Sequence, residues 1–216
     1  MIIAIDGPAG AGKSTVAKLV AKSLGYLYLD TGAMYRALTF KVLEEGIDIA
    51  DTKKITDLAS KSIISFINNP DGQIKILLDG IDVSLDIRQS RITKLVSDVA
   101  KIKGVRQVML KLQRELGIKG KVVLDGRDIG TVVFPDAEKK FYIDAGLKER
   151  VKRRYKELKG LGQNVTVDAV EDDLSNRDKI DSNREFAPLK KADDAIYVDT
   201  TDMTIEEVVS KILDSL

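Results

Sequence analysis

The segment GPAGAGKS, at residues 7–14, constrains the fold of this chain more than any other segment. It matches the pattern G-x-x-x-x-G-K-[ST] at every fixed position. The apolar run IIAID precedes it, and a segment with one apolar stripe, from Lys13 to Leu24, follows it. This pattern binds phosphate where a buried strand passes through a glycine-rich turn into a helix. The sequence therefore predicts an α/β fold with a nucleoside triphosphate bound at the first strand-to-helix turn.

Four later segments also read as strands that are buried on both faces of a sheet, because they are short and mainly apolar. They are YLYLD, KVVLD, KKFYID and AIYVDT, at residues 26–30, 121–125, 139–144 and 195–200. Helical patterns lie between them, including TGAMYRALTFKVLEEG, which Gly46 ends, and TIEEVVSKILDSL at residues 204–216. Strands that alternate with helices predict a doubly wound, parallel, five-stranded sheet.

The pattern changes between Gly46 and about residue 100, where we expect a small antiparallel β insertion flanked by helical segments. The apolar runs SIISFI, IKILL and IDVSL are separated by NNPDGQ and by Asp79-Gly80. Asp-Gly between alternating apolar segments is a strong signal for a two-residue hairpin turn. A second irregular segment, KGLGQNVTVD at residues 159–168, interrupts two charged helices.

The composition restricts the chemistry that the chain can perform. It contains no cysteine and no histidine, which excludes disulfides, thiolate ligands and the commonest general base. Its formal charge of +1 gives no reason to expect binding to nucleic acid or to a membrane surface. No apolar run approaches the ~18–20 residues of a membrane span, and the start MIIAIDGPAG does not resemble a signal peptide. We therefore expect a cytoplasmic protein that works with Asp, Lys, Arg and oxygen-bound cations.

The phosphate loop predicts the donor site. Backbone N–H groups would converge on phosphate oxygens, Lys13 would reach the β- and γ-phosphates, and Ser14 would hold Mg²⁺. The expected triphosphate-binding residues are Gly7, Pro8, Ala9, Gly10, Ala11, Gly12, Lys13, Ser14 and Thr15. The chain has neither the Asp-x-x-Gly nor the Asn-Lys-x-Asp sequence that a GTPase switch would carry. A small phosphotransferase that uses ATP fits the sequence better.

An acceptor site is expected near the ends of three predicted strands. Asp6, Asp30 and Asp125 each close a strand, and the last is followed by Gly126-Arg127-Asp128. In open α/β sheets, ligands bind beyond the carboxyl ends of the strands, so these side chains should face one crevice. Arg36 lies one helical turn beyond Thr31-Gly32, which follow the second predicted strand, and its planar guanidinium is suited to a phosphate.

Five segments together carry a resemblance to a known family. They are GPAGAGKST, LDTGAMYR, VRQVMLKLQR, LDGRDIGTVVFPDA and NRDKIDSNREFAPLKKADDAIYVDT. With the β-containing insertion, they make the chain resemble bacterial cytidylate kinases from end to end. The first segment is shared by many kinases, but the combination of DGRDIGTVVFPDA with Asp-x-x-Arg and APL is specific.

The resemblance implies transfer of the γ-phosphoryl group of ATP to CMP and dCMP with Mg²⁺, within pyrimidine nucleotide metabolism. It implies a core of residues 1–45, 101–150 and 176–216, an NMP-binding insertion of residues 46–100 and a lid of residues 151–175. We expect a monomer whose partners are small-molecule substrates rather than nucleic acid or membrane.

The resemblance also assigns roles to individual residues. The acceptor phosphate would be surrounded by Thr31, Tyr35, Arg36 and Arg127. The cytosine edge would be recognised by Ser97, Arg106 and Asp128, and the ribose would be held by Arg177 and Asp181. The transferred phosphoryl group would be contacted by the catalytic residues Lys13, Arg127, Arg153, Arg154 and Arg184, and the metal would be held by Ser14 and Asp125. Family members often carry Ser in place of Thr31 and Gly in place of Ser14, and the second difference favours Ser14 as a metal ligand.

The lid would carry arginines on one helix face, since Arg150, Arg153 and Arg154 lie at i, i+3 and i+4. We expect these three to fold over the phosphates and exclude water.

Physical chemistry supports part of this assignment independently. Cytosine offers an amine that donates and ring atoms that accept, so a carboxylate, an arginine and a hydroxyl are complementary to it. Two alternatives remain open at this point. One is a kinase of the same fold that acts on UMP, AMP or a small hydroxy acid, and the other is a nucleotide-binding regulator without turnover.

Overall fold

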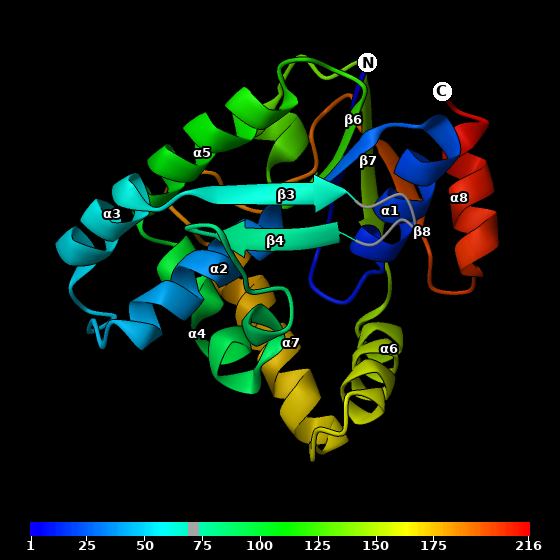
Figure 1. Ribbon diagram of the computed structural model, residues 1–216. Coiled ribbons are helices and arrows are strands. Elements are labelled where there is room, and N and C mark those ends of the chain that lie inside the picture. The colour runs from blue at the N-terminus through cyan, green and yellow to red at the C-terminus, as the bar shows by residue number, and fades with distance from the viewer. Residues whose placement is uncertain (69–73) are drawn as a thin grey trace.

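A five-stranded parallel sheet forms the centre of the computed structural model, which describes residues 1–68 and 74–216 (Figure 1). The strand order is β2-β6-β1-β7-β8, and each neighbouring pair is parallel. The strands are β1 (Ile2–Asp6), β2 (Leu27–Asp30), β6 (Val122–Gly126), β7 (Lys139–Asp144) and β8 (Ile196–Asp199). The predicted fold class and all five predicted strands are confirmed, and no strand end differs from its predicted position by more than one residue.

Helices cover both faces of this sheet, which explains why its strands are apolar on both sides. On one face Ile3 and Ile5 pack with α1 (Lys13–Leu24) and α8 (Ile205–Leu213). On the other face Ala4 and Leu124 lie in a second cluster, against which α5 (Lys103–Gly117) packs. Consecutive residues of β1 therefore point to opposite layers of one core.

The expected antiparallel insertion is also confirmed. It contains β3 (Ile64–Asn68), β4 (Ile74–Leu78) and β5 (Ile81–Asp82), preceded by α3 (Thr52–Lys61) and followed by the short helix η1 (Asp86–Arg88) and α4 (Ser90–Ala100). Asp79 and Gly80 have φ values of 51° and 85°, as a two-residue hairpin turn requires. The expected turn NNPDGQ lies, apart from Asn68, outside the described residues.

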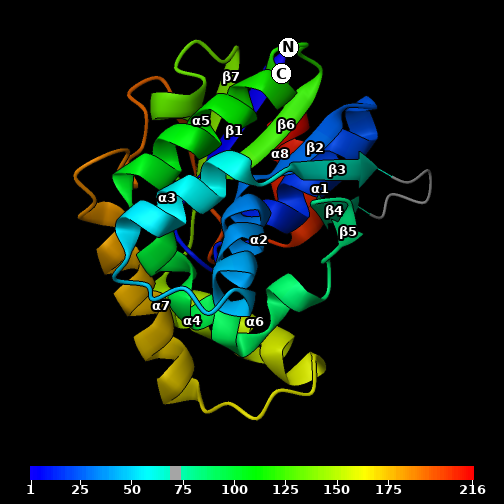
Figure 2. The ribbon, with the colours of Figure 1, turned by 60° about the vertical axis from the view of Figure 1, so that its left-hand side comes forward.

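The insertion is attached to the core through α2 (Thr31–Glu44). Ile64, Ile76 and Leu78 of its sheet share one buried cluster with Leu38 of α2 and Met109 of α5. Figure 2 shows α2 between the three-stranded sheet and α4. The start of α2 is therefore held beside the edge at which the parallel strands end.

Two helices follow the sheet's fourth strand in the chain, α6 (Leu147–Gly160) and α7 (Val167–Ser182). They pack against each other and extend away from the sheet (Figure 1). The irregular segment expected at residues 159–168 is confirmed in outline, as α6 ends at Gly160 and Thr166 caps α7 by accepting from the Ala169 N–H.

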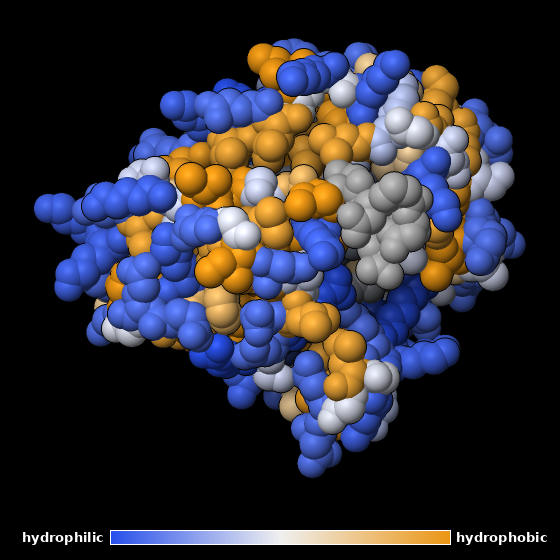
Figure 3. Space-filling view, viewed as in Figure 1, coloured by the Kyte–Doolittle hydropathy of each residue, from blue (hydrophilic) through white to orange (hydrophobic). Residues whose placement is uncertain are grey.

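Apolar side chains remain exposed on the face that carries β3 and β4, where orange and blue atoms alternate (Figure 3). Among them are Ile63, Ile67 and Ile81, whereas Ile64 and Ile76 point to the buried side. The alternation along β3 shows that only one face of the small sheet is buried in this chain. No helix in the described part of the chain is long and apolar enough to span a membrane.

We predict that Leu38→Ala lowers the free energy of unfolding by about 2–5 kcal/mol, because it leaves a cavity in the cluster that attaches the insertion. Leu85 is 84% exposed, so Leu85→Ala is the matched control and should change the stability by less than about 0.5 kcal/mol. Urea unfolding of both variants checks this. Equal losses in the two variants would show that the cluster does not carry the attachment.

Candidate active site

A cleft of about 630 Å³ lies at the carboxyl ends of β2 and β6, beside the phosphate loop. It collects side chains from the core, the insertion and the two extended helices. Residues 9–15 line it, together with Thr31, Tyr35, Arg36, Ser97, Arg106, Asp125, Arg127, Asp128, Arg153, Arg154, Arg177, Asp181 and Arg184. The structure thus brings together most of the residues singled out in the sequence. Of the described phosphate-loop residues, Gly7 and Pro8 are not part of this lining.

The phosphate loop needs glycine where it leaves β1. A Cβ on Gly7 would lie 1.9 Å from the carbonyl oxygen of Ile143, and the φ of Gly7 is +147°. A side chain at this position would therefore displace the loop from the sheet. Lys13 curls back into the loop, where its Nζ donates to the carbonyl oxygen of Pro8 at 2.6 Å. Burial, followed by the charge of Arg127, lowers the pKa of the Lys13 amine.

Arg150 differs from the expectation that it folds over phosphates with Arg153 and Arg154. Its side chain is buried, and its Nη1 donates to the carbonyl oxygen of Ala9 at 2.9 Å and to Asp178 at 2.6 Å. Asp178 also accepts from the Ala9 N–H at 3.1 Å. The pair therefore holds both polar backbone groups of Ala9 and fastens the phosphate loop to α6 and α7.

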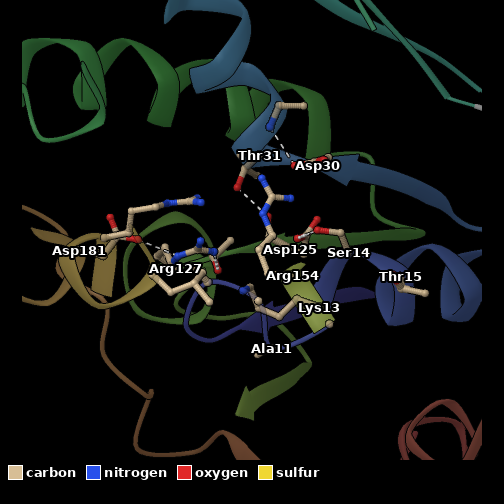
Figure 4. A pocket seen from close by; sticks show the side chains of 18 of the residues that line it. Ala11, Lys13, Ser14, Thr15, Asp30, Thr31, Asp125, Arg127, Arg154 and Asp181 are labelled. Carbon is tan, nitrogen blue, oxygen red and sulfur yellow. Dashed lines mark hydrogen bonds and ion pairs between the residues drawn. The ribbon is translucent and has the colours of Figure 1, made fainter. Parts of the chain in front are cut away.

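The two expected metal ligands lie side by side (Figure 4). Ser14 Oγ donates to Asp125 Oδ2 at 2.7 Å, and Tyr28 Oη donates to Asp125 Oδ1 at 2.8 Å. Burial, followed by the charge of Asp30, raises the pKa of Asp125. Among the described residues no group of three His, Cys, Asp or Glu side chains is arranged to hold a metal. A hydroxyl and a carboxylate suit Mg²⁺, which commonly takes its remaining ligands from water and phosphate.

Arg106 and Asp128 also line the cleft, and they form an ion pair with a distance of 2.6 Å from Nη2 to Oδ2. The two side chains are only 3% and 9% exposed. The guanidinium carbon of Arg106 lies 5.3 Å from the centre of the Tyr35 ring, and burial raises the pKa of Tyr35 to about 12. Ser97 is also buried and lines the same cleft. The lining of the cleft therefore includes a carboxylate, a guanidinium and a hydroxyl in addition to the phosphate loop.

Several further arginines line the cleft. Arg127 donates to Asp181 at 2.9 Å, and Arg184 pairs with the other oxygen of Asp181. Arg36 donates to Thr93 at 2.9 Å, and burial together with the charge of Arg177 lowers its pKa to about 9. Within the described residues, buried guanidinium nitrogens without a hydrogen-bond partner are the Nε atoms of Arg106, Arg154, Arg177 and Arg184. Buried unpaired donors are costly, so the cleft is suited to an anion with several oxygens.

Figure 4 shows how these groups are arranged. Asp181 and Arg127 lie on one side, Ser14 and Asp125 on the other, and Lys13 and Arg154 between them. Side chains of the phosphate loop therefore face the same space as Arg127 and Arg154. Transfer between two bound phosphates requires such an arrangement.

The comparison with known families agrees with this geometry. The family model described as cytidylate kinase matches residues 3–216. The chain belongs to the cytidylate kinase family. A protein named cytidylate kinase from Clostridioides difficile (strain 630) is 52% identical over 216 residues, which is 100% of this chain and 98% of that protein. The cytidylate kinase of Bacillus subtilis (strain 168) is 49% identical over 214 residues, covering 99% of this chain and 95% of that one.

Solved structures show the same fold at much lower sequence identity. An uncharacterized protein from Eubacterium ventriosum ATCC 27560 has a TM-score of 0.52 and 13% identity, over 100% of this chain and 97% of that one. A gluconokinase from Sinorhizobium meliloti 1021 has a TM-score of 0.50 and 14% identity, over 98% and 89%. These likenesses establish the fold alone, whereas the full-length identities establish the cytidylate kinase family.

Sequence reasoning missed three residues that shape the site of this family member. Asp178 clamps the loop, Tyr28 orients Asp125, and Arg88 of η1 lines the cleft. Tyr28 lies between two leucines of a predicted strand, so its side chain points to the opposite face of the sheet from theirs. A polar hydroxyl at such a position is a sequence signal that could have identified Tyr28. The chain around Asp178 is rich in charge, so nothing local distinguishes that residue from its neighbours.

We predict that the protein takes up protons when ATP binds at pH 8. The pKa of Lys13 is low in the free cleft, and triphosphate charge next to the amine would raise it, so the bound state holds more protons. Titration calorimetry in buffers of different ionisation enthalpy measures this uptake. It should largely disappear in Lys13→Met and persist in Lys18→Met, where the replaced lysine is an exposed residue of the same helix. Equal uptake in both variants would assign the proton to another group.

Proposed function

We propose that the chain transfers the γ-phosphoryl group of ATP to CMP and to dCMP, which gives ADP with CDP or dCDP. The observation that carries the proposal is that the buried pair of Arg106 and Asp128 lines the same cleft as the phosphate loop. Membership of the cytidylate kinase family supports the same reaction.

The pair of Arg106 and Asp128 is complementary to cytosine. The exocyclic amine of cytosine would donate to Asp128, and its ring acceptors would meet Arg106 and the hydroxyl of Ser97. Uracil would instead turn a carbonyl oxygen toward the carboxylate of Asp128. Because both side chains of the pair are buried, this mismatch would not be relieved by water.

The acceptor phosphate would lie among Thr31, Tyr35, Arg36 and Arg127. Thr31 Oγ1 donates to the carbonyl oxygen of Asp125 at 2.6 Å, which holds its hydroxyl at the strand end. Arg177 and Asp181 would hold the ribose, and Asp181 is fixed by its bonds to Arg127 and Arg184. These roles use groups that the cleft already presents together.

The chemical step needs little covalent work from the protein. An oxygen of the acceptor phosphate, largely ionised at neutral pH, attacks the γ-phosphorus in line while the bond to the bridging oxygen of ADP breaks. No general base is needed, which suits a chain without histidine. The charge of the transferred group would be neutralised by Lys13, Arg127, Arg153, Arg154 and Arg184. Ser14 and Asp125 would hold Mg²⁺, whose charge lowers the cost of bringing two phosphates together.

We also propose the division into a core of residues 1–45, 101–150 and 176–216, an NMP-binding insertion of residues 46–100 and a lid of residues 151–175. Arg153 and Arg154 of α6 line the cleft, and Ser90 Oγ donates to Gln163 Oε1 at 2.7 Å, which connects the insertion with the proposed lid. A lid in contact with the insertion would limit the access of water to the phosphates.

Location and assembly remain predictions. A chain without cysteine is compatible with a reducing cytoplasm, and its near-zero net charge does not favour nucleic acid. Sedimentation equilibrium of the purified protein would test the expected monomer.

A coupled assay with ATP and each of CMP, dCMP, UMP and AMP tests the proposed function. We expect turnover of CMP and dCMP with kcat/KM well above the values for UMP and AMP. A preference for UMP or AMP would contradict the proposed substrate, although the assignment to the family and the fold would still stand.

We predict that Asp128→Asn lowers the CMP-to-UMP ratio of kcat/KM by more than about tenfold, because a hydrogen bond to a charged group contributes about 1.5–3 kcal/mol. The asparagine amide can donate to uracil O4, so the reaction with UMP should improve in relative terms. The matched control is Asp136→Asn, an exposed position of the same segment that does not line the cleft. An unchanged ratio in Asp128→Asn would remove Asp128 from base recognition.

A further inference from the structure

Asp6, the last residue of β1, is a buried carboxylate that the reaction described above does not use. Its side chain is 4% exposed and is not part of the lining of the cleft. Oδ1 accepts from the Ile129 N–H at 2.8 Å, and Oδ2 accepts from the Gly130 N–H at 2.7 Å. Each carboxylate oxygen of Asp6 therefore accepts a hydrogen bond from one of the two backbone N–H groups that directly follow Asp128.

These two N–H groups begin η2 (Ile129–Val133), a single π-helical turn. The first N–H groups of a helix have no partner within it, and Ile129 and Gly130 are both buried. A carboxylate at this position satisfies two of them and is favoured by the helix dipole. Asp6 thus caps the turn from a different strand, 123 residues earlier in the chain.

The backbone of Asp128 is held from the other side as well. Its carbonyl oxygen accepts from the Val132 and Val133 N–H groups at 2.9 and 3.1 Å. Asp128 therefore stands at the point where the turn, the end of β6 and the carboxylate of Asp6 meet. Its own side chain reaches Arg106 at 2.6 Å from this fixed position.

We propose that Asp6 is a positioning residue for recognition of the acceptor base, because it fixes the segment that presents Asp128 to Arg106. This inference rests on the proposed function. Asp6 would act on the acceptor and not on the donor, although it also precedes Gly7 of the phosphate loop.

A competing role is electrostatic. The pKa of Asp6 is raised to about 7, mainly because the group is buried and also because of the charge of Asp128, although hydrogen bonds from Gly130 and Ile129 and the charge of Lys13 act in the opposite direction. If Asp6 served mainly to balance the charge of Lys13, its removal would weaken the use of ATP. If it positions Asp128, its removal would weaken discrimination between CMP and UMP. The two roles therefore affect different kinetic constants.

Asp6→Asn separates these roles. Asparagine has nearly the same size but only one acceptor oxygen, so one of the two N–H groups would face the amide NH₂. We expect KM for CMP to rise and the CMP-to-UMP ratio of kcat/KM to fall by about tenfold. The reason is that a small displacement of Asp128 from its position would weaken its hydrogen bond to the base. KM for ATP should stay within about twofold of the parent value, since the substitution does not change the groups that would bind ATP.

Asp144→Asn is the matched control, because Asp144 ends the neighbouring strand β7 and its side chain accepts from the Ala145 N–H at 2.8 Å and from Tyr197 Oη at 3.4 Å, two residues that do not line the cleft. It should leave the CMP-to-UMP ratio unchanged. A parent enzyme that does not prefer CMP would refute the proposed function itself. A parent that prefers CMP, together with an unchanged ratio in Asp6→Asn or a rise in KM for ATP alone, would overturn only the inference about Asp6.

If Asp6→Asn does not fold, amide-resolved hydrogen exchange of the parent decides the question. Ile129 and Gly130 should exchange slowly in the ligand-free protein, with amide proton shifts moved downfield by bonds to a carboxylate. Rapid exchange at both positions before CMP is added would show that Asp6 does not hold the segment and would overturn the proposal.

Discussion

Buried guanidinium groups determine how this site is built, because each one needs an anionic partner to offset its loss of hydration. Three aspartates supply most of these partners. Asp128 pairs with Arg106, Asp181 binds Arg127 and Arg184, and Asp178 binds Arg150. Two of the pairs join a helix to the segment after β6, namely Arg106 with Asp128 and Asp181 with Arg127, and a third joins α6 to α7. The arginines are therefore held in place before a substrate arrives.

The positive charge that these aspartates do not neutralise indicates which kind of ligand the cleft can bind. Arg36 donates to the hydroxyl of Thr93, which carries no charge, and the pKa of Arg177 is lowered by burial and by the charge of Arg127. Arg154 pairs with the half-exposed Glu157, and its buried Nε has no partner among the described residues. Phosphate groups would supply the absent negative charge, and the site would lose little by reorganising because its donors are already oriented.

Local patterns in the sequence were enough to predict much of this structure. The phosphate loop, the five strands and the Asp79-Gly80 turn each depend on residues that are neighbours in the chain, and all were confirmed. The acceptor residues were named from the resemblance to a family, and the cleft gathers them. Their individual roles stay predictions until they are tested by substitution.

The parts that sequence reasoning missed depend on contacts between distant residues. Arg150 has the helical spacing of a lid arginine, but Asp178, 28 residues later, draws it to the back of the phosphate loop. The prediction that Asp6 faces the crevice with Asp30 and Asp125 is wrong, because Asp6 does not line the cleft. Its bond to Ile129 spans 123 residues and involves a π-helical turn that no local pattern indicates. Such pairings depend on how the strands and helices pack, which local patterns of residue types do not reveal.

Titration calorimetry of the parent protein with CMP, UMP and cytidine, without ATP, tests the central claim most directly. The central claim is that one cleft recognises both a cytosine edge and a phosphate through oriented, buried charges. We therefore expect CMP to bind more tightly than UMP, which lacks the matching base, and more tightly than cytidine, which lacks the phosphate. Equal affinity for CMP and UMP, or equal affinity for CMP and cytidine, would contradict it.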